Sequence, residues 1–91
     1  MPTFQLLIKG KVQGVFYRST ARHKARELNI SGWIRNTNEG DVEAMISGED
    51  KNLKLFIEWC KTGPAEADVT DVTVTQQPPM TFNSFEIKRH S

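Results

Sequence analysis

The sequence contains a single cysteine among its 91 residues, which excludes an internal disulfide framework. Residues 1–20 contain no apolar stretch of the kind found in secretory signals, so we expect a cytoplasmic protein. No run approaches the roughly 18 consecutive apolar residues that a transmembrane helix requires, so we expect no membrane association. A chain of this length has room for one hydrophobic core, and we expect residues 1–91 to form a single domain.

Acidic residues are absent from the first 26 positions, which contain six lysines and arginines. The whole chain has a formal net charge of +1, so the remaining 65 residues have a formal net charge of −5. Such a concentration of positive charge is typical of a solvated helix surface, and equally of a region that attracts an anionic ligand. Charge alone leaves both interpretations open.

The spacing of apolar residues predicts a strand and then a helix in the N-terminal third. Residues 4–12 alternate between apolar and polar side chains, as a strand with one buried face does. After a short loop, Ala21, Ala25 and Leu28 recur with helical spacing, which predicts an amphipathic helix that ends near Asn29.

A β-hairpin and a second helix are predicted next. Two apolar-bearing runs, 30–37 and 41–48, are separated by Asn38-Glu39-Gly40, and a short polar loop with a glycine is typical of a hairpin. Apolar residues at helical spacing predict a second helix from about Asp50, which Gly63-Pro64 would terminate.

The C-terminal third predicts two more strands. Residues 69–74 are rich in valine and threonine, and a short last strand is expected at 85–88, after Pro78-Pro79. The element order is therefore βαββαβ with a short fifth strand. Two βαβ-like crossovers joined by a hairpin predict an α+β fold, the ferredoxin-like sandwich, in which two helices lie on one face of a single antiparallel sheet.

Residues 10–18 read GKVQGVFYR, a strand end followed by a glycine loop and the start of a helix. Gly14 can adopt a positive φ that lets backbone N–H groups converge, and a helix N-terminus adds partial positive charge beside them. The guanidinium of Arg18 can hold two phosphoryl oxygens and keeps its charge at physiological pH. This pattern predicts a phosphate-binding loop.

Nucleophiles and metal ligands are scarce elsewhere. Cys60 lies on the apolar face of the second predicted helix and is interpreted as a core residue. His23 lies on a polar helix face, where a solvated role is expected, and His90 lies in the C-terminal tail. Because the carboxylates are scattered along the chain, we expect no metal site and no cofactor.

A site made of a backbone nest and one arginine can stabilise a phosphoryl group but lacks an acid to protonate a poor leaving group. The leaving group must therefore be good already. A carboxylate leaves readily, so a mixed carboxylic–phosphoric anhydride suits this site, whereas sugar and alcohol phosphates would be poor substrates.

Two segments carry a resemblance to the acylphosphatase family. Residues 10–18 fit the family's first signature, G-x-V-Q-G-V-x-[FY]-R, at every specified position. Residues 32–36 fit the second, G-[FYW]-[AVC]-[KRQ]-N, which continues with Gly40, Val42 and Gly48. Ile34 is the one departure from it, because the family usually has Ala, Val or Cys there.

The resemblance extends over nearly the whole chain and implies hydrolysis of small acyl phosphates to a carboxylate and inorganic phosphate, without a metal. It implies that Arg18 binds the phosphoryl group and that Asn36 positions the attacking water. It also implies that phosphate contacts the backbone amides of one loop, formed by Gln13, Gly14, Val15, Phe16, Tyr17 and Arg18.

Two other functions stay open. A non-catalytic anion-binding domain would keep the loop without turnover, like the acylphosphatase-like modules of larger carbamoyl-transfer proteins, although the presence of Asn36 favours catalysis. RNA-recognition domains share the element order but need aromatic residues on adjacent central strands, and residues 41–48 contain none. We therefore expect a small-molecule partner and no nucleic acid. We also expect a monomer, since Leu55 and Trp59 alone do not make an interface.

Overall fold

Seven helices and strands follow one another in the computed structural model, which describes residues 1–88. They are β1 (Thr3–Lys11), α1 (Tyr17–Glu27), β2 (Ser31–Asn36), β3 (Val42–Ser47), α2 (Asp50–Thr62), β4 (Asp68–Gln77) and β5 (Phe85–Ile87). Each predicted element is present, and α1 ends two residues before its predicted end. His90 lies outside the described residues. Among residues 1–88, every helix is too short and too polar to cross a bilayer.

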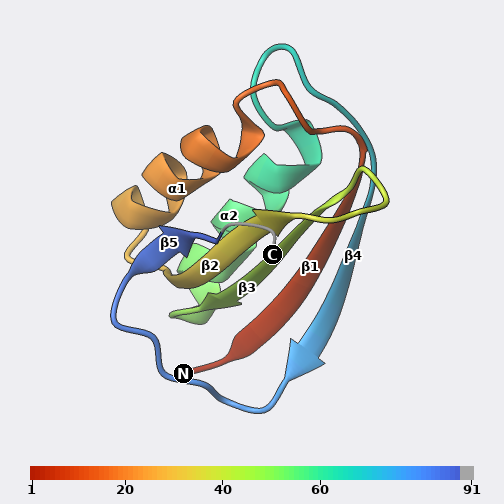
Figure 1. The fold of residues 1–91 in the computed structure, drawn as a ribbon. Helices are drawn as coiled ribbons and strands as arrows, with labels where there is room; N and C mark the ends of the chain where they lie inside the picture. Colours follow the sequence, from red (N-terminus) through yellow and green to blue (C-terminus); the bar gives the residue numbers. More distant parts are fainter. Residues whose placement is uncertain (89–91) are drawn as a thin grey trace.

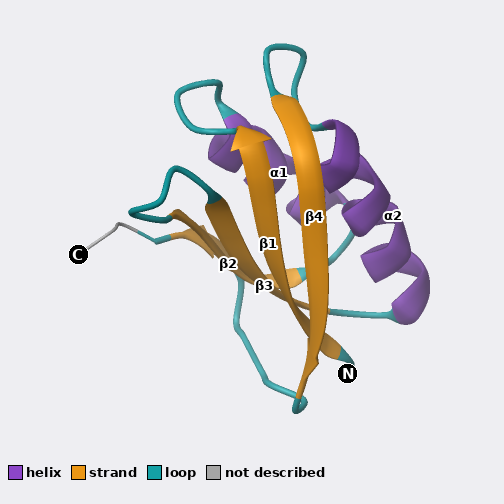
Figure 2. Cartoon of the chain, turned by 90° about the vertical axis from the view of Figure 1, so that its right-hand side faces the viewer, coloured by secondary structure: helices purple, strands orange, loops and turns teal. Residues whose placement is uncertain are grey.

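The strands form one sheet in the order β4-β1-β3-β2-β5, and both helices pack on the same face of it (Figures 1 and 2). This arrangement confirms the ferredoxin-like sandwich. The pairs β1·β3, β1·β4 and β2·β3 are antiparallel, as predicted, but β5 pairs in parallel with β2, so the sheet is mixed. The reason is the connection after β4, which returns across the end of the sheet and lets β5 run in the same direction as β2 (Figure 1).

The core lies between the sheet and the helices. Alternate residues of β1, such as Leu6 and Ile8, are fully buried and face α1 and α2. The face of α1 that meets the sheet carries Ala21 and Ala25, and such small side chains let the helix approach the strands closely. On α2 the buried residues include Cys60, which confirms its prediction as a core residue.

A bulge at the end of β1 directs the chain toward the loop that precedes α1. The pairing of β1 with β4 shifts register between Lys9 and Gly10, and Gly10 has φ 127°. A Cβ atom at this position would collide with the backbone carbonyl of Asp68 on β4. The glycine that opens the first signature is therefore required by the close approach of two strands rather than by contact with a ligand.

Candidate active site

The loop between β1 and α1 is held by alternate side chains. Val15 and Tyr17 are buried in the core, whereas Gly14 and Phe16 are exposed. Gly14 has φ 74°, as the sequence predicted, and Phe16 also has a positive φ, of 63°. The buried side chains therefore anchor the loop, and its backbone faces solvent.

The N–H groups of this loop are free to bind an anion. Among the hydrogen bonds within residues 1–88, none is donated by a backbone N–H of residues 13–19, and the first donor of α1 is the amide of Thr20. The first turn of α1 contains no acidic residue that could compete with an anion for these donors. Unpartnered N–H groups at a helix N-terminus, beside a glycine turn, form an anion-binding surface.

A pocket of about 280 Å³ lies at this loop and brings the two predicted catalytic side chains together. Arg18 reaches it from the first turn of α1, and Asn36 reaches it from the last residue of β2. Arg18 makes no ion pair within residues 1–88, so its donors are available to a ligand. Within residues 1–88, the lining consists of Val12, Gly14, Phe16, Tyr17, Arg18, Ser19, Asn36 and Ile87.

The side chain of Asn36 carries a polar atom without a partner. Its Oδ1 atom is buried and has no hydrogen bond within residues 1–88. A buried acceptor left unsatisfied costs about 1–3 kcal/mol, so such atoms are rare in folded proteins and call for an explanation. A water or ligand in the adjoining pocket would supply the missing donor.

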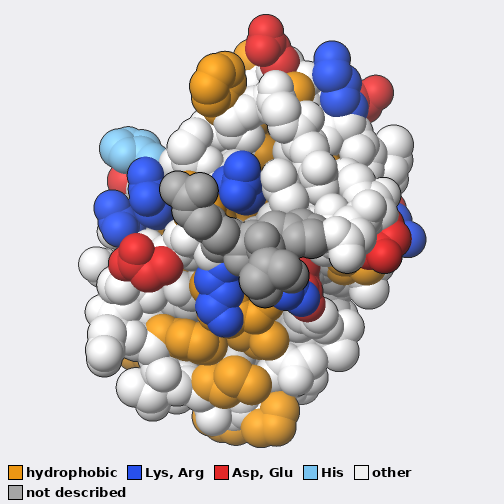
Figure 3. Space-filling view, in the orientation of Figure 1, with side chains coloured by type: hydrophobic (Ala, Val, Ile, Leu, Met, Phe, Trp, Pro, Cys, Tyr) orange, Lys and Arg blue, Asp and Glu red, His pale blue; other side chains and the backbone are white. Residues whose placement is uncertain are grey.

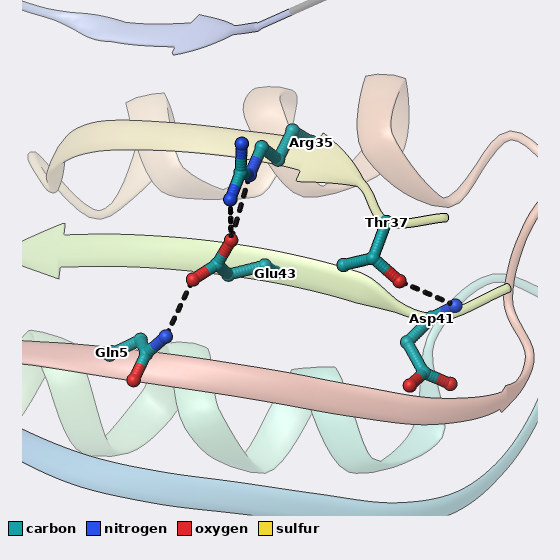
Figure 4. Close-up of polar contacts among 5 residues, drawn as sticks. All are labelled: Gln5, Arg35, Thr37, Asp41 and Glu43. Carbon is teal, nitrogen blue, oxygen red and sulfur yellow. Dashed lines mark hydrogen bonds and ion pairs between the residues drawn. The ribbon is translucent and has the colours of Figure 1, made fainter. Parts of the chain in front are cut away.

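Gln13 connects the two halves of the pocket. Its side-chain amide donates to the carbonyl oxygens of Thr37 (2.9 Å) and Asp41 (2.8 Å), the residues that close the hairpin after Asn36. Thr37 and Asp41 also bond to each other through the Thr37 Oγ1 atom (Figure 4). Gln13 therefore holds the loop of residues 13–16 against the end of β2. Sequence reasoning missed this role, because the partners are more than 20 residues away.

Tyr17 connects the loop to the end of α2. Its hydroxyl donates to the carbonyl oxygen of Cys60 at 2.7 Å. In a helix that carbonyl would accept from the N–H four residues later, but this residue is Pro64, which has no N–H. The tyrosine hydroxyl therefore satisfies a carbonyl that the proline leaves without a donor.

Burial keeps the Tyr17 hydroxyl and the Cys60 thiol protonated. It raises the pKa of the Cys60 thiol to about 12, although the hydrogen bond with Tyr17 opposes this shift, and it raises the pKa of the Tyr17 hydroxyl as well. The thiolate is the reactive form of cysteine, so Cys60 is not available as a nucleophile at physiological pH.

Replacing Tyr17 with phenylalanine is expected to lower the free energy of unfolding by about 1–3 kcal/mol, because it leaves the buried Cys60 carbonyl unsatisfied. The ring and its packing on Trp59 would be kept, since the centroids lie 5.5 Å apart in the native protein. Urea unfolding measures the effect. Thr62→Val, which alters an exposed residue at the same helix end, is the control and should change stability by less than about 0.5 kcal/mol. Equal losses of stability in Tyr17→Phe and Thr62→Val would contradict the role of the Tyr17 hydroxyl as a cap of α2.

Charged side chains near the pocket mostly pair with one another. Arg35 follows Ile34 on β2, and its guanidinium bonds to the carboxylate of Glu43 on β3 at 2.6–2.7 Å (Figure 4). The Glu43 carboxylate also accepts a hydrogen bond from the side-chain amide of Gln5. These residues lie on the open face of the sheet, where basic side chains gather around the middle (Figure 3). His23 is four-fifths exposed on α1, which confirms the predicted solvated role.

Two further sequence expectations concern metals and nucleic acid. Within residues 1–88, the side chains of His, Cys, Asp and Glu form no group of three that could hold a metal ion. Phe4, the aromatic residue of the first strand, packs against the core, and the open face of β3 presents Glu43 and Met45. Among the described residues, β1 and β3 therefore carry no pair of aromatic side chains for base stacking, and the ring of Trp33 on the neighbouring β2 contacts Arg35 and Lys88.

Comparison with known proteins places this chain in a family. The family model described as acylphosphatase matches residues 4–87. An acylphosphatase of Acaryochloris marina is 47% identical over 83 residues, which cover 91% of this chain and 89% of that protein. One of Haloquadratum walsbyi is 43% identical over 84 residues, with 92% and 90% covered. The crystal structure of an acylphosphatase from Bacillus subtilis matches with a TM-score of 0.94 at 30% identity and covers 97% of this chain and 99% of that one. The chain therefore belongs to the acylphosphatase family, whose members are hydrolases that act on acid anhydrides.

Proposed function

We propose that this protein hydrolyses the carboxyl–phosphate bond of small acyl phosphates without a metal ion. In this proposal Arg18 and the backbone amides of residues 13–18 hold the phosphoryl group, and Asn36 holds the attacking water. The observation that carries it is the convergence on one pocket of the Arg18 guanidinium, a row of backbone N–H groups and the Oδ1 atom of Asn36, all of them without a protein partner within residues 1–88.

The proposed reaction needs positioning and charge stabilisation more than acid–base groups. The water oxygen forms a bond to phosphorus while the bond from phosphorus to the carboxylate oxygen breaks, and the carboxylate leaves with the electron pair. The proton of the water passes to a phosphoryl oxygen or to solvent. Negative charge spreads over the phosphoryl oxygens in such a transition state, where Arg18 and the loop amides would meet it.

Asn36 would orient the water rather than deprotonate it. Its amide oxygen can accept a hydrogen bond from the water, and its amide nitrogen can donate to a phosphoryl oxygen. Holding the nucleophile in line with the breaking bond converts a bimolecular encounter into an effectively unimolecular step. The unpartnered Oδ1 atom supports this role, because it is an acceptor for which the protein provides no donor among residues 1–88.

The proposed substrate class follows from what lines the pocket. Among residues 1–88, its lining contains no carboxylate, histidine or cysteine side chain that could protonate an alkoxide leaving group. A carboxylate leaving group does not need to be protonated by an acid. We keep the expectations of a monomer and of a cytoplasmic location.

Hydrolysis of benzoyl phosphate tests this proposal. Purified protein in EDTA is expected to cleave benzoyl phosphate rapidly and p-nitrophenyl phosphate, an ester control, far more slowly, because benzoate is a better leaving group than p-nitrophenolate. Loss of activity in EDTA would contradict the metal-independent mechanism. Binding of inorganic phosphate with no hydrolysis of the anhydride would make the protein a binding module instead.

A further inference from the structure

Phe16 stands out among the aromatic residues of the described chain. Its side chain is 76% exposed, whereas every other aromatic side chain in residues 1–88 is at least partly buried. It nevertheless lines the pocket that contains Arg18 and Asn36. An exposed phenylalanine contributes little to the hydrophobic core, so the fold alone does not explain its presence.

The backbone of Phe16 is held in an unfavourable conformation. Its φ of 63° and ψ of 24° lie in the left-handed region, where a residue with a bulky side chain is an outlier and glycine is the usual choice. Three hydrogen bonds to its carbonyl oxygen hold it there, from the Thr20 amide (3.1 Å), the Thr20 hydroxyl (2.8 Å) and the Ser19 hydroxyl (3.2 Å). Strain maintained in this way at the edge of a site points to a function.

The position of the ring suggests what it contacts. The polar groups of the pocket, Arg18 and Asn36, would hold the phosphoryl group, so the acyl group must extend toward the remaining wall. The rest of the described lining is mostly apolar: it contains Phe16, Val12 and Ile87, with Gly14, Tyr17 and Ser19 beside them. A volume of about 280 Å³ also leaves room beyond a phosphoryl group for an acyl substituent.

We propose that Phe16 determines substrate specificity by packing its ring on the acyl group, so that flat aromatic acyl phosphates are preferred over acetyl phosphate. This inference rests on the proposed function and goes beyond it, because it names the acyl class. Aromatic contacts of this kind change affinity by about threefold to tenfold, and the methyl group of acetyl phosphate offers little surface for them.

The test compares kcat/KM for benzoyl phosphate and acetyl phosphate in the wild type, Phe16→Gly and Phe16→Trp. Phe16→Gly is expected to lower the benzoyl-to-acetyl ratio by about threefold to tenfold, mainly through the KM for benzoyl phosphate. Phe16→Trp should keep the ratio at or above its wild-type value. Leu55→Ala, which removes a 53% exposed side chain of α2 outside the pocket, is the matched control and should leave the ratio unchanged.

The outcomes separate this inference from the proposed function. Glycine suits φ 63°, so Phe16→Gly should unfold at no lower urea concentration than the wild type, and a lost preference would not reflect a damaged fold. An active wild type whose ratio is the same in Phe16→Gly, or falls as far in Leu55→Ala, overturns the specificity role alone. A wild type that hydrolyses neither substrate overturns the proposed function, and this inference with it.

Discussion

Replacing Arg18 with alanine is expected to lower kcat/KM for benzoyl phosphate by about a thousandfold or more. Arginines that neutralise a phosphoryl transition state are worth about 10³–10⁵ in rate, and among residues 1–88 no second basic side chain lines this pocket to replace it. Arg18→Lys should recover only part of the loss, because an ammonium keeps the charge but lacks the planar fork of donors. Steady-state kinetics in EDTA give kcat/KM for the wild type, Arg18→Ala and Arg18→Lys.

Arg22→Ala is the matched control for this prediction. Arg22 lies one turn further along α1, lacks an ion pair within residues 1–88 and is absent from the pocket lining. Its removal takes the same charge from the same helix, so it reports how much of the effect is a general loss of positive field. We expect a far smaller decrease, and one that fades as salt is added. An Arg18→Ala variant as active as Arg22→Ala would remove Arg18 from the mechanism.

Replacing Asn36 with alanine is expected to lower kcat by about a hundredfold to a thousandfold, as the loss of a single positioned hydrogen-bonding group does in other hydrolytic sites. Asn36→Asp keeps the shape of the side chain but places a negative charge beside the phosphoryl group, so it should be no more active than the alanine variant. Both variants are measured on benzoyl phosphate at saturating substrate.

The stability of the Asn36→Ala variant distinguishes a functional amide from a structural one. Because Oδ1 is buried without a partner in residues 1–88, its removal should leave the free energy of unfolding unchanged or raise it. Asn38→Ala, in the exposed hairpin loop outside the pocket, should alter neither activity nor stability. An Asn36→Ala variant that loses activity only in proportion to lost stability would mean that Asn36 supports the hairpin rather than the reaction.

Features that depend on neighbours in the chain could be read from the sequence. The alternation of β1, the helical spacing of α1 and the turn chemistry of the hairpin placed these elements within two residues of their observed bounds, whereas β4 extends three residues beyond its predicted end. Gly14 and Arg18 were found for the same reason, because a glycine turn that leads into a helix is a local pattern. Asn36 was located at a strand end, and its proximity to Arg18 was implied only by the family resemblance.

Features that depend on contacts between distant segments had no such signal. The parallel pairing of β5 with β2 depends on the path of the connection after β4. In the sequence Gln13 is an ordinary loop residue, because its hydrogen bonds to the carbonyl oxygens of Thr37 and Asp41 form only in the folded protein.

The sequence by itself determined the element order, the glycine turn that leads into α1 and the residue types of the pocket, because periodicity and turn chemistry act over a few residues. Only the tertiary structure decided that Tyr17 caps α2, that the Oδ1 atom of Asn36 lacks a partner in the described chain, and that the exposed ring of Phe16 lies at the pocket. Hydrogen bonding and burial are properties of the packed molecule, and they arise only when segments far apart in the chain meet.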